Sequence, residues 1–422
     1  MSDEKLAPST PAEEAPLLAT RAGFPILATS TYLISHSLGA MPARVRDSLR
    51  DYAEIWATRG IRSWAEKWWA MPGSAGDVLC DVLGAEHGTI VMHQNVSICQ
   101  SLIASCFEFR APRNRVVFES LNFPTVSYVW KERERDGAEV VEVASPDGMT
   151  VPTEAMLAAI DERTLLVPIS HVLYKSSYLQ DAKRIIDHAH RMGAMVLLDC
   201  YQSAGTVPFS LEDLGVDFAC GGSVKWLCGG PGAGWLYVRP DLREQLRPRV
   251  TGWMAHAAPF DFEPAPIRLA DTSYRFLHGS PAIPAIYAAL PGYETIRALG
   301  VRNIRRKSLR QTELIRREAL ARGLRVTSPE DPARRGGTIT IDPAPLAKGG
   351  AKADDVQRNR IGSAVVKALA AREILVDFRP GAGIRVSAHF YNTDDELLGC
   401  LDAIAEVAKS GTFEKFTGGA AY

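Results

Sequence analysis

Long apolar runs, paired cysteines and an excess of charge of one sign are all missing from this 422-residue sequence. Its seven cysteines are scattered without a Cys-x-x-Cys pair, which argues against a disulfide framework or zinc site and for a reducing compartment. A formal net charge of −1 provides no basic field to attract nucleic acid or an anionic membrane. The longest apolar runs, such as Met195–Leu198, are too short to span a bilayer. We therefore expect a cytoplasmic protein with no metal, nucleic-acid or membrane partner.

The composition is that of an ordinary globular protein, with 46% hydrophobic and 23% charged residues. Its length suggests two or three domains, and no repeat of fixed period is present. The stretch Met1–Pro16 is acidic and rich in Ala, Pro and Ser, and it lacks the basic start and apolar core of a signal peptide. We expect a disordered or extended lead-in over residues 1–30.

Short apolar runs alternate with helix-like segments through the first two thirds of the chain. The predicted strands are Thr89–Met92, Arg115–Glu119, Glu139–Val143, Leu165–Ser170, Met195–Asp199, Asp217–Cys220 and Gly234–Val238. The predicted helices between them are Asn95–Phe107, Pro124–Asp136, Pro152–Ile160 and Asp181–Met192. This alternation is typical of βαβ units, so we expect an α/β fold around a mostly parallel seven-stranded sheet with helices on both faces.

The pattern changes near Pro291, where one long charged helix, or two joined helices, extends to about Leu320. A smaller α+β unit follows, with strands at Gly337–Ile341, Ile374–Asp377 and Gly383–Ser387 and helices at Asp354–Arg372 and Thr393–Val407. We predict a large domain over residues 31–295 and a small domain over 296–422, with an arm at 31–50 packing against the small one. Such layouts place the site between domains, at the carboxyl ends of strands.

Two charged residues follow predicted strands. Asp199 ends the most apolar strand, so it is either a helix cap or turn residue, or it meets a buried cation such as a protonated pyridine nitrogen. Lys225 lies in the glycine-rich stretch Gly221–Gly234. It is either a surface residue with a buried stem or an amine of lowered pKa that forms an imine with an aldehyde. The pair suits pyridoxal phosphate, an electron-sink cofactor whose ring nitrogen needs an acid.

Two further strand ends carry candidate cofactor contacts. Phe123 follows the strand Arg115–Glu119 and is either core or a ring that stacks on a cofactor. Met92–Ser97 is a strand-to-helix junction whose free N–H groups suit a phosphate. Asn95 or Ser97 serves equally well there as a helix N-cap.

Taken together and in this order, these segments resemble the class V family of pyridoxal-phosphate enzymes, and the kynureninases in particular, from about Tyr32 to Arg385. The matching motifs are Tyr32–Gly39, Ile61–Trp64, Asn122–Thr125, Ser170–Lys175, Asp199–Gly205, Ser223–Gly232, Gly252–His256 and Arg275–Ser280. The resemblance implies the fold-type I architecture of aspartate aminotransferase, bound pyridoxal phosphate, and a homodimer with shared active sites.

The resemblance also implies a role for individual residues. Lys225 would hold the cofactor as a Schiff base and move the Cα proton, while Asp199 would pair with the pyridinium. The other implied cofactor contacts are Asn95, Val96, Phe123, Gln202 and Ser223, together with Trp253 and Ser280 from a neighbouring subunit. The implied substrate contacts are Arg385, which would clamp the α-carboxylate, and His36, Trp64 and His256, each of which is equally well explained as core or interface.

The implied reaction is hydrolytic Cβ–Cγ cleavage of L-kynurenine or a related amino acid, which gives anthranilate and alanine and belongs to tryptophan degradation. Several positions depart from the kynureninase pattern: Val224 replaces Tyr, Val126 replaces Asp and His36 replaces Asn. The segment Val386–Asn392 looks more like other class V aminotransferases, cysteine desulfurases and epimerases. Transamination, C–S cleavage or epimerisation of another amino acid is therefore the alternative.

Two readings outside this family are disfavoured. A binding protein that lost catalysis is disfavoured because Lys225 and Asp199 both remain. A nucleotide-binding loop at Gly229–Gly234 is disfavoured because these glycines lead into a predicted strand, not a helix whose N-terminus would hold a phosphate.

Overall fold

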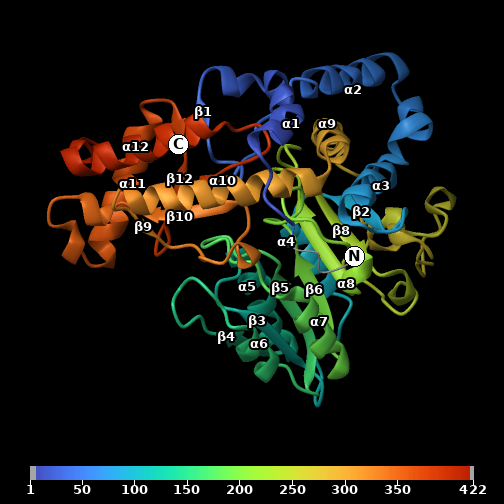
Figure 1. Ribbon diagram of the computed structural model, residues 1–422. Helices are drawn as coiled ribbons and strands as arrows, with labels where there is room; N and C mark the ends of the chain where they lie inside the picture. The colour runs from blue at the N-terminus through green and yellow to red at the C-terminus, as the bar shows by residue number, and fades with distance from the viewer. Residues whose placement is uncertain (1–5, 419–422) are drawn as a thin grey trace.

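The computed structural model describes residues 6–418, and a seven-stranded sheet forms its centre (Figure 1). Its strands, in spatial order, are β2 (Ile90–His93), β8 (Gly234–Val238), β7 (Phe218–Gly222), β6 (Met195–Asp199), β5 (Thr164–Ser170), β3 (Arg115–Glu119) and β4 (Glu139–Val143). All neighbouring pairs from β7 to β4 are parallel, while β8 runs antiparallel to both β2 and β7. The expected mostly parallel sheet is therefore confirmed.

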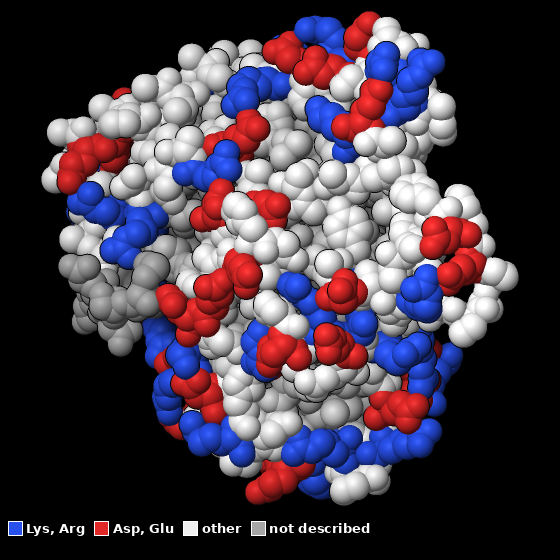
Figure 2. Space-filling view, turned by 90° about the vertical axis from the view of Figure 1, so that its right-hand side faces the viewer, with Lys and Arg blue, Asp and Glu red and all other residues white. Residues whose placement is uncertain are grey.

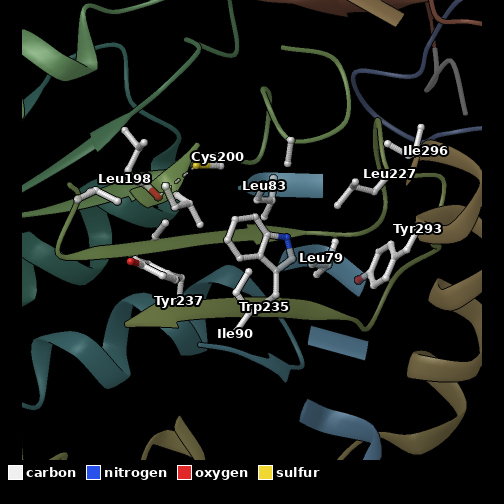
Figure 3. Close-up of a cluster of buried hydrophobic side chains, with 14 of the residues drawn as sticks. Leu79, Leu83, Ile90, Leu198, Cys200, Leu227, Trp235, Tyr237, Tyr293 and Ile296 are labelled. Carbon is white, nitrogen blue, oxygen red and sulfur yellow. Dashed lines mark hydrogen bonds between the residues drawn. The ribbon is translucent and has the colours of Figure 1, made fainter. Parts of the chain in front are cut away.

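Helices cover both faces of this sheet, because the central strands are buried on both sides. On β6, Val196 and Leu198 belong to one apolar core and Leu197 to the other. The first core is closed by α3 (Met71–Leu83), α6 (Thr153–Ala159), α7 (Ala182–Arg191), α8 (Leu211–Leu214) and α9 (Ile283–Leu299), and the second by α4 (Val96–Ala104) and α5 (Pro124–Lys131). Figure 3 shows the indole of Trp235 in the first core, with Leu79 and Leu83 of α3 beside it.

A second, four-stranded antiparallel sheet belongs to the C-terminal part of the chain. Its order is β12 (Asp377–Arg379), β13 (Gly383–Ser387), β10 (Thr338–Asp342) and β9 (Arg325–Val326). It shares an apolar core with α10 (Val301–Ala321), α11 (Asp355–Ala370) and α12 (Asp394–Ser410). The long charged segment is two helices that meet at Gly300, whose φ of 76° breaks the helical path. The domain division at residue 295 falls within α9 and stays a prediction.

The expectation of a disordered or extended lead-in over residues 1–30 is wrong for the segments that form helical turns. These are Pro11–Glu14, α1 (Ala15–Leu18), Ala19–Gly23 and Pro25–Ala28. They are held because Leu17, Phe24 and Leu27 are buried and because the buried Glu14 carboxylate accepts hydrogen bonds of 2.6 and 2.8 Å from Arg310 of α10. Residues 1–5 lie outside the described residues.

The arm predicted at 31–50 divides between two neighbours. β1 (Thr31–Tyr32) pairs in parallel with β11 (Ile374–Leu375), and Leu33 joins the core of the C-terminal sheet. The following helix α2 (Val45–Arg59) instead lies along α9, where the Ser48 hydroxyl donates to a backbone carbonyl. Within residues 6–418, no helix is long and apolar enough to cross a membrane.

Candidate active site

A cavity of about 230 Å³ lies at the carboxyl ends of β3, β5 and β6. It is lined by Asn95, Val96, Ser97, Phe123, Thr125, Ser170, Val172, Tyr174, Asp199, Tyr201, Gln202 and Lys225. Six of the residues that the sequence nominated, namely Asn95, Val96, Phe123, Asp199, Gln202 and Lys225, are thus brought together. Their position is the one that parallel α/β sheets use for ligands, because side chains from several strand ends converge there.

Lys225 follows β7 and points its amine at two aromatic rings. The Nζ atom lies 5.6 Å from the ring centre of Phe123 and 4.4 Å from that of Tyr201. None of the described residues accepts a hydrogen bond from this nitrogen. Burial lowers the pKa of Lys225, and the Arg385 cation lowers it further, against the opposing pull of Asp199. A buried amine with this bias is a nucleophile for an aldehyde.

Asp199 ends β6 and is only 5% exposed. Its Oδ1 accepts a 2.8 Å hydrogen bond from the backbone N–H of Tyr201. Burial raises the pKa of this carboxyl, while the Tyr201 N–H and the Lys225 charge oppose the rise. A buried carboxylate with so little compensation suits a cationic ligand atom, such as a protonated pyridine nitrogen.

The N-terminus of α4 supplies an anion-binding end to the cavity. Asn95 is the N-cap, and its side chain accepts a 3.0 Å hydrogen bond from the Ile98 N–H. The N–H groups of the first helical turn have no acceptor within the helix, which suits a phosphate. The hydroxyls of Ser97 and Thr125 lie 3.3 Å apart on the same lining. Thr125 was not among the candidate phosphate contacts, because sequence alone does not show that α4 and α5 begin side by side.

Gln202 and Ser223 illustrate how far a motif specifies side-chain direction. Gln202 lines the cavity, but its amide is engaged with the His36 carbonyl and the Trp226 indole N–H, each at 3.0 Å. The Ser223 hydroxyl lies outside the lining, where it donates to the Ala233 carbonyl at 2.6 Å and bonds the Tyr293 hydroxyl. The structure therefore does not bring Ser223 to the phosphate end.

Arg385 lies in a buried cluster next to the cavity rather than on its lining. Two of its nitrogens donate to the two carboxylate oxygens of Asp377, and the third donates to the Tyr174 carbonyl at 2.7 Å. His36 Nε2 donates to the same carboxylate at 2.9 Å. The guanidinium fork expected to clamp a substrate carboxylate is thus held by Asp377, and the clamp stays a prediction that requires this pair to open.

The charges in this cluster compensate one another. Burial alone would raise the pKa of Asp377, but His36 and Arg385 hold it well below its usual range. Burial lowers the pKa of His36 to about 4, so the ring is neutral and carries its proton on Nε2. His36 is buried behind the cavity and does not line it.

Trp64, Trp253 and His256 lie away from the cavity, around a group of aromatic side chains. Trp64 stacks on Trp69 with ring centres 4.1 Å apart, and the Trp253 ring meets Trp69 at 5.2 Å. His256 is buried and accepts a 3.0 Å hydrogen bond from a nearby backbone N–H. Ser280 is exposed. Figure 2 faces this side of the molecule, where charged side chains border a broad uncharged area.

The residues present fit pyridoxal phosphate. Lys225 supplies an amine for its aldehyde, Asp199 a buried carboxylate for its ring nitrogen, and the start of α4 a cradle for its phosphate. That cradle is shaped by Gly234 of β8, since a Cβ there would lie 2.9 Å from the Asn95 backbone. Within the described residues, no group of His, Cys, Asp or Glu is arranged to hold a metal ion.

Comparisons with known proteins identify the family of the chain. The sequence matches the family described as Aminotransferase class-V over residues 31–398. It is 29% identical to the uncharacterized aminotransferase YcbU of Bacillus subtilis, over 90% of this chain and 95% of that one. It is 28% identical to the kynureninase of Pseudomonas fluorescens, over 90% of each chain.

The fold agrees with solved structures as well. A variant of the cystine C–S lyase C-DES, with glycine covalently linked to its pyridoxal-phosphate cofactor, superposes with a TM-score of 0.79 at 19% identity, over 92% of this chain and 99% of that one. The sequence match covers both sheets, and the cavity holds the lysine and aspartate that the cofactor requires. The chain therefore belongs to the class-V aminotransferase family of pyridoxal-phosphate-dependent enzymes.

Proposed function

We propose that this enzyme hydrolyses the Cβ–Cγ bond of L-kynurenine or a related amino acid and releases anthranilate and alanine. The observation that carries the proposal is the incompletely paired amine of Lys225, beside buried Asp199, in a cavity walled by aromatic rings. Similarity to proteins named kynureninase over nine tenths of the chain supports this choice of substrate.

The chain's own residues divide the work between holding and moving protons. Pyridoxal phosphate, when bound, supplies an electron sink for negative charge at the substrate Cα. Asp199 keeps a proton on the ring nitrogen, because the buried carboxylate is stabilised by an adjacent cation. Lys225, whose pKa burial lowers, takes the Cα proton as a neutral amine. The start of α4 anchors the phosphate.

The walls of the cavity suit an aryl ketone side chain. Phe123, Tyr174 and Tyr201 present aromatic surface, and the rings of Phe123 and Tyr174 meet edge to face with centres 5.2 Å apart. In the overall reaction one water is consumed: its hydroxyl goes to Cγ, which becomes the anthranilate carboxylate, and Cβ gains a proton as the methyl group of alanine. No oxidant or reductant is required.

We also propose that the enzyme is a homodimer in which Trp253 and Ser280 complete the site of the other subunit. Exposed apolar side chains near the aromatic group support a covered face, among them Trp56, Ile61 and Phe262. Mixing Lys225→Ala with Trp253→Ala protein tests this proposal. Recovery of turnover on mixing supports shared sites, because one mixed site holds both residues; no recovery, or a monomeric mass by light scattering, contradicts them.

The second candidate is transamination of another amino acid. It is favoured by the segment Val386–Asn392, which looks more like other class V aminotransferases, and by the relative named as an uncharacterized aminotransferase. Under this candidate the overall reaction would exchange an amino group between an amino acid and a keto acid, with Lys225 moving the proton at the substrate Cα.

Absorbance spectroscopy with product analysis separates the two candidates. Purified enzyme with pyridoxal phosphate is mixed with L-kynurenine, and Lys225→Ala protein serves as the control. Anthranilate and alanine in equal amounts support the hydrolase. A cofactor spectrum that does not respond to L-kynurenine, together with keto-acid formation from other amino acids, contradicts it and favours transamination.

A further inference from the structure

Tyr201 is fixed relative to both charged groups of the site, although the family resemblance gives it no role. Its backbone N–H donates to the Asp199 carboxylate at 2.8 Å, and its ring centre lies 4.4 Å from Lys225 Nζ. The side chain also lines the cavity. The ring therefore borders whatever is joined to the lysine amine, on a backbone that is tied to the aspartate.

Gly222, the last residue of β7, provides the seat for this ring. A Cβ at this position would overlap the Tyr201 side chain, and the three atoms nearest to it are Cζ, Oη and Cε2 of Tyr201. Gly222 does not have a positive φ, so its backbone conformation is open to any residue. Space for Tyr201, and not backbone geometry, therefore requires glycine at this position.

Phe123 borders the same nitrogen from another element. It is the N-cap residue of α5, its ring is 44% exposed, and its ring centre lies 5.6 Å from Lys225 Nζ. The two aromatic side chains thus come from two strand ends, and both face the amine that binds the cofactor.

We propose that Tyr201 is a cofactor-binding residue whose ring packs against pyridoxal phosphate as the second aromatic wall besides Phe123, and that Gly222 sets how deeply this wall sits. The inference rests on pyridoxal phosphate being the cofactor, which family membership establishes. The contact is made by the ring rather than by the hydroxyl. Burial raises the pKa of the Tyr201 phenol to about 12, so the side chain remains uncharged and packs as a neutral ring.

Cofactor affinity tests the ring contact without relying on turnover. The dissociation constant of pyridoxal phosphate is measured by equilibrium dialysis for wild type, Tyr201→Ala and Tyr201→Phe, with far-UV circular dichroism to verify folding. Tyr201→Ala is expected to weaken binding about tenfold, since an aromatic pair contributes on that scale, and Tyr201→Phe to stay within about twofold. Wild-type affinity in Tyr201→Ala overturns the proposal, as does an equal loss in both variants, which would assign the effect to the hydroxyl.

The seat is tested by a double-mutant cycle. Gly222→Ala is expected to weaken binding about tenfold or more by pushing the Tyr201 ring into the cavity, and to have no further effect in a Tyr201→Ala background. Gly399→Ala on α12 is the matched control, because a Cβ there meets open space. An equal loss from Gly222→Ala in both backgrounds would show that the glycine acts independently of Tyr201 and overturns the second part of the proposal. If Tyr201→Ala does not fold, Tyr201→Leu takes its place in both experiments.

Discussion

Asp199 and Asp377 are equally buried, at 5% exposure each, yet their carboxyl groups respond to burial in opposite ways. Asp199 accepts one backbone hydrogen bond, and its pKa is raised. Asp377 accepts hydrogen bonds from Arg385 and His36, and its pKa is lowered. The charges of both aspartates raise the pKa of Lys225, against the effect of burial.

We call the surroundings of Asp199 and Lys225 the prepared site, because its charges lack partners that a ligand can supply. We call the surroundings of Asp377 the finished cluster, because its charges are already paired. Burying a charge costs free energy unless partners replace the lost water. Around Asp377 the chain supplies those partners itself. Around Asp199 and Lys225 it supplies few, which leaves the compensation to a bound molecule. Incomplete pairing, more than burial, therefore marks where the cofactor belongs.

Removing the lysine breaks the prepared site most severely. Lys225→Ala is expected to lower turnover about 10⁴-fold, because it removes both the covalent attachment point and the group that moves the Cα proton. Steady-state rates and the cofactor absorbance of the dialysed protein measure this loss. Lys183→Ala, at an exposed ion pair on α7, is the control and leaves both unchanged. Turnover in Lys225→Ala within about tenfold of the wild-type rate would contradict the assignment.

Neutralising Asp377 in the finished cluster is expected to lower the stability of the fold. Asp377→Asn leaves the Arg385 cation buried without its partner, which lowers the free energy of unfolding by about 3–5 kcal/mol. Urea denaturation of the cofactor-free protein measures it. Asp402→Asn removes one partner of an exposed ion pair and changes the value by less than about 1 kcal/mol. Equal effects of the two substitutions would show that burial does not distinguish these pairs.

For Asp199, in the prepared site, we expect a large loss of turnover and little loss of stability. Asp199→Asn keeps an oxygen to accept from the Tyr201 N–H but does not hold a proton on the ring nitrogen, so turnover falls about 10²- to 10³-fold. The cofactor-free protein retains its free energy of unfolding within about 1 kcal/mol, because a poorly compensated charge has been removed. A loss of stability as large as that of Asp377→Asn would remove the contrast between the two carboxylates.

The smallest expected effect is a loss of folding stability at acidic pH that is caused by His36. Its pKa is about 4 when folded and about 6.5 when unfolded, so the unfolded state binds more protons between these values. Stability is therefore lost as the pH falls from 6.5 towards 4, by about 1.4 kcal/mol per pH unit from this residue. His36→Asn, which restores the residue usual in kynureninases, is expected to remove that share of the slope. Urea denaturation at several pH values compares the two proteins, and parallel slopes would contradict the assignment.

Much of the central sheet was predictable because its strands are apolar on both faces. Met195–Asp199 and Gly234–Val238 have the predicted bounds, since glycine or polar residues stop each run. Helices α2 and α3 were not predicted. In α2 only Val45 is buried, so no apolar stripe marks the helix, and α3 opens with Met-Pro-Gly, which is typical of a turn.

The candidate site was predictable where a residue's position decides its role. Asp199 and Lys225 are placed at the cavity by the ends of β6 and β7. Side-chain direction was not predictable: Ser223 turns towards Tyr293, and Arg385 is held by Asp377. Ser223 and Tyr293 are 70 residues apart, while Arg385 and Asp377 lie eight residues apart on the adjacent strands β13 and β12. In both cases the partner lies outside the short motif that carried the prediction.

The pairing of β1 with β11 has a consequence for how this chain is made. The Ser30 hydroxyl donates to Glu373, 343 residues further along, and Thr31 pairs with Ile374. During synthesis the N-terminal arm must therefore wait, without its partner strand, until nearly all of the chain has left the ribosome. Contacts of such long range form slowly, so the last step of assembly joins the first residues made to some of the last.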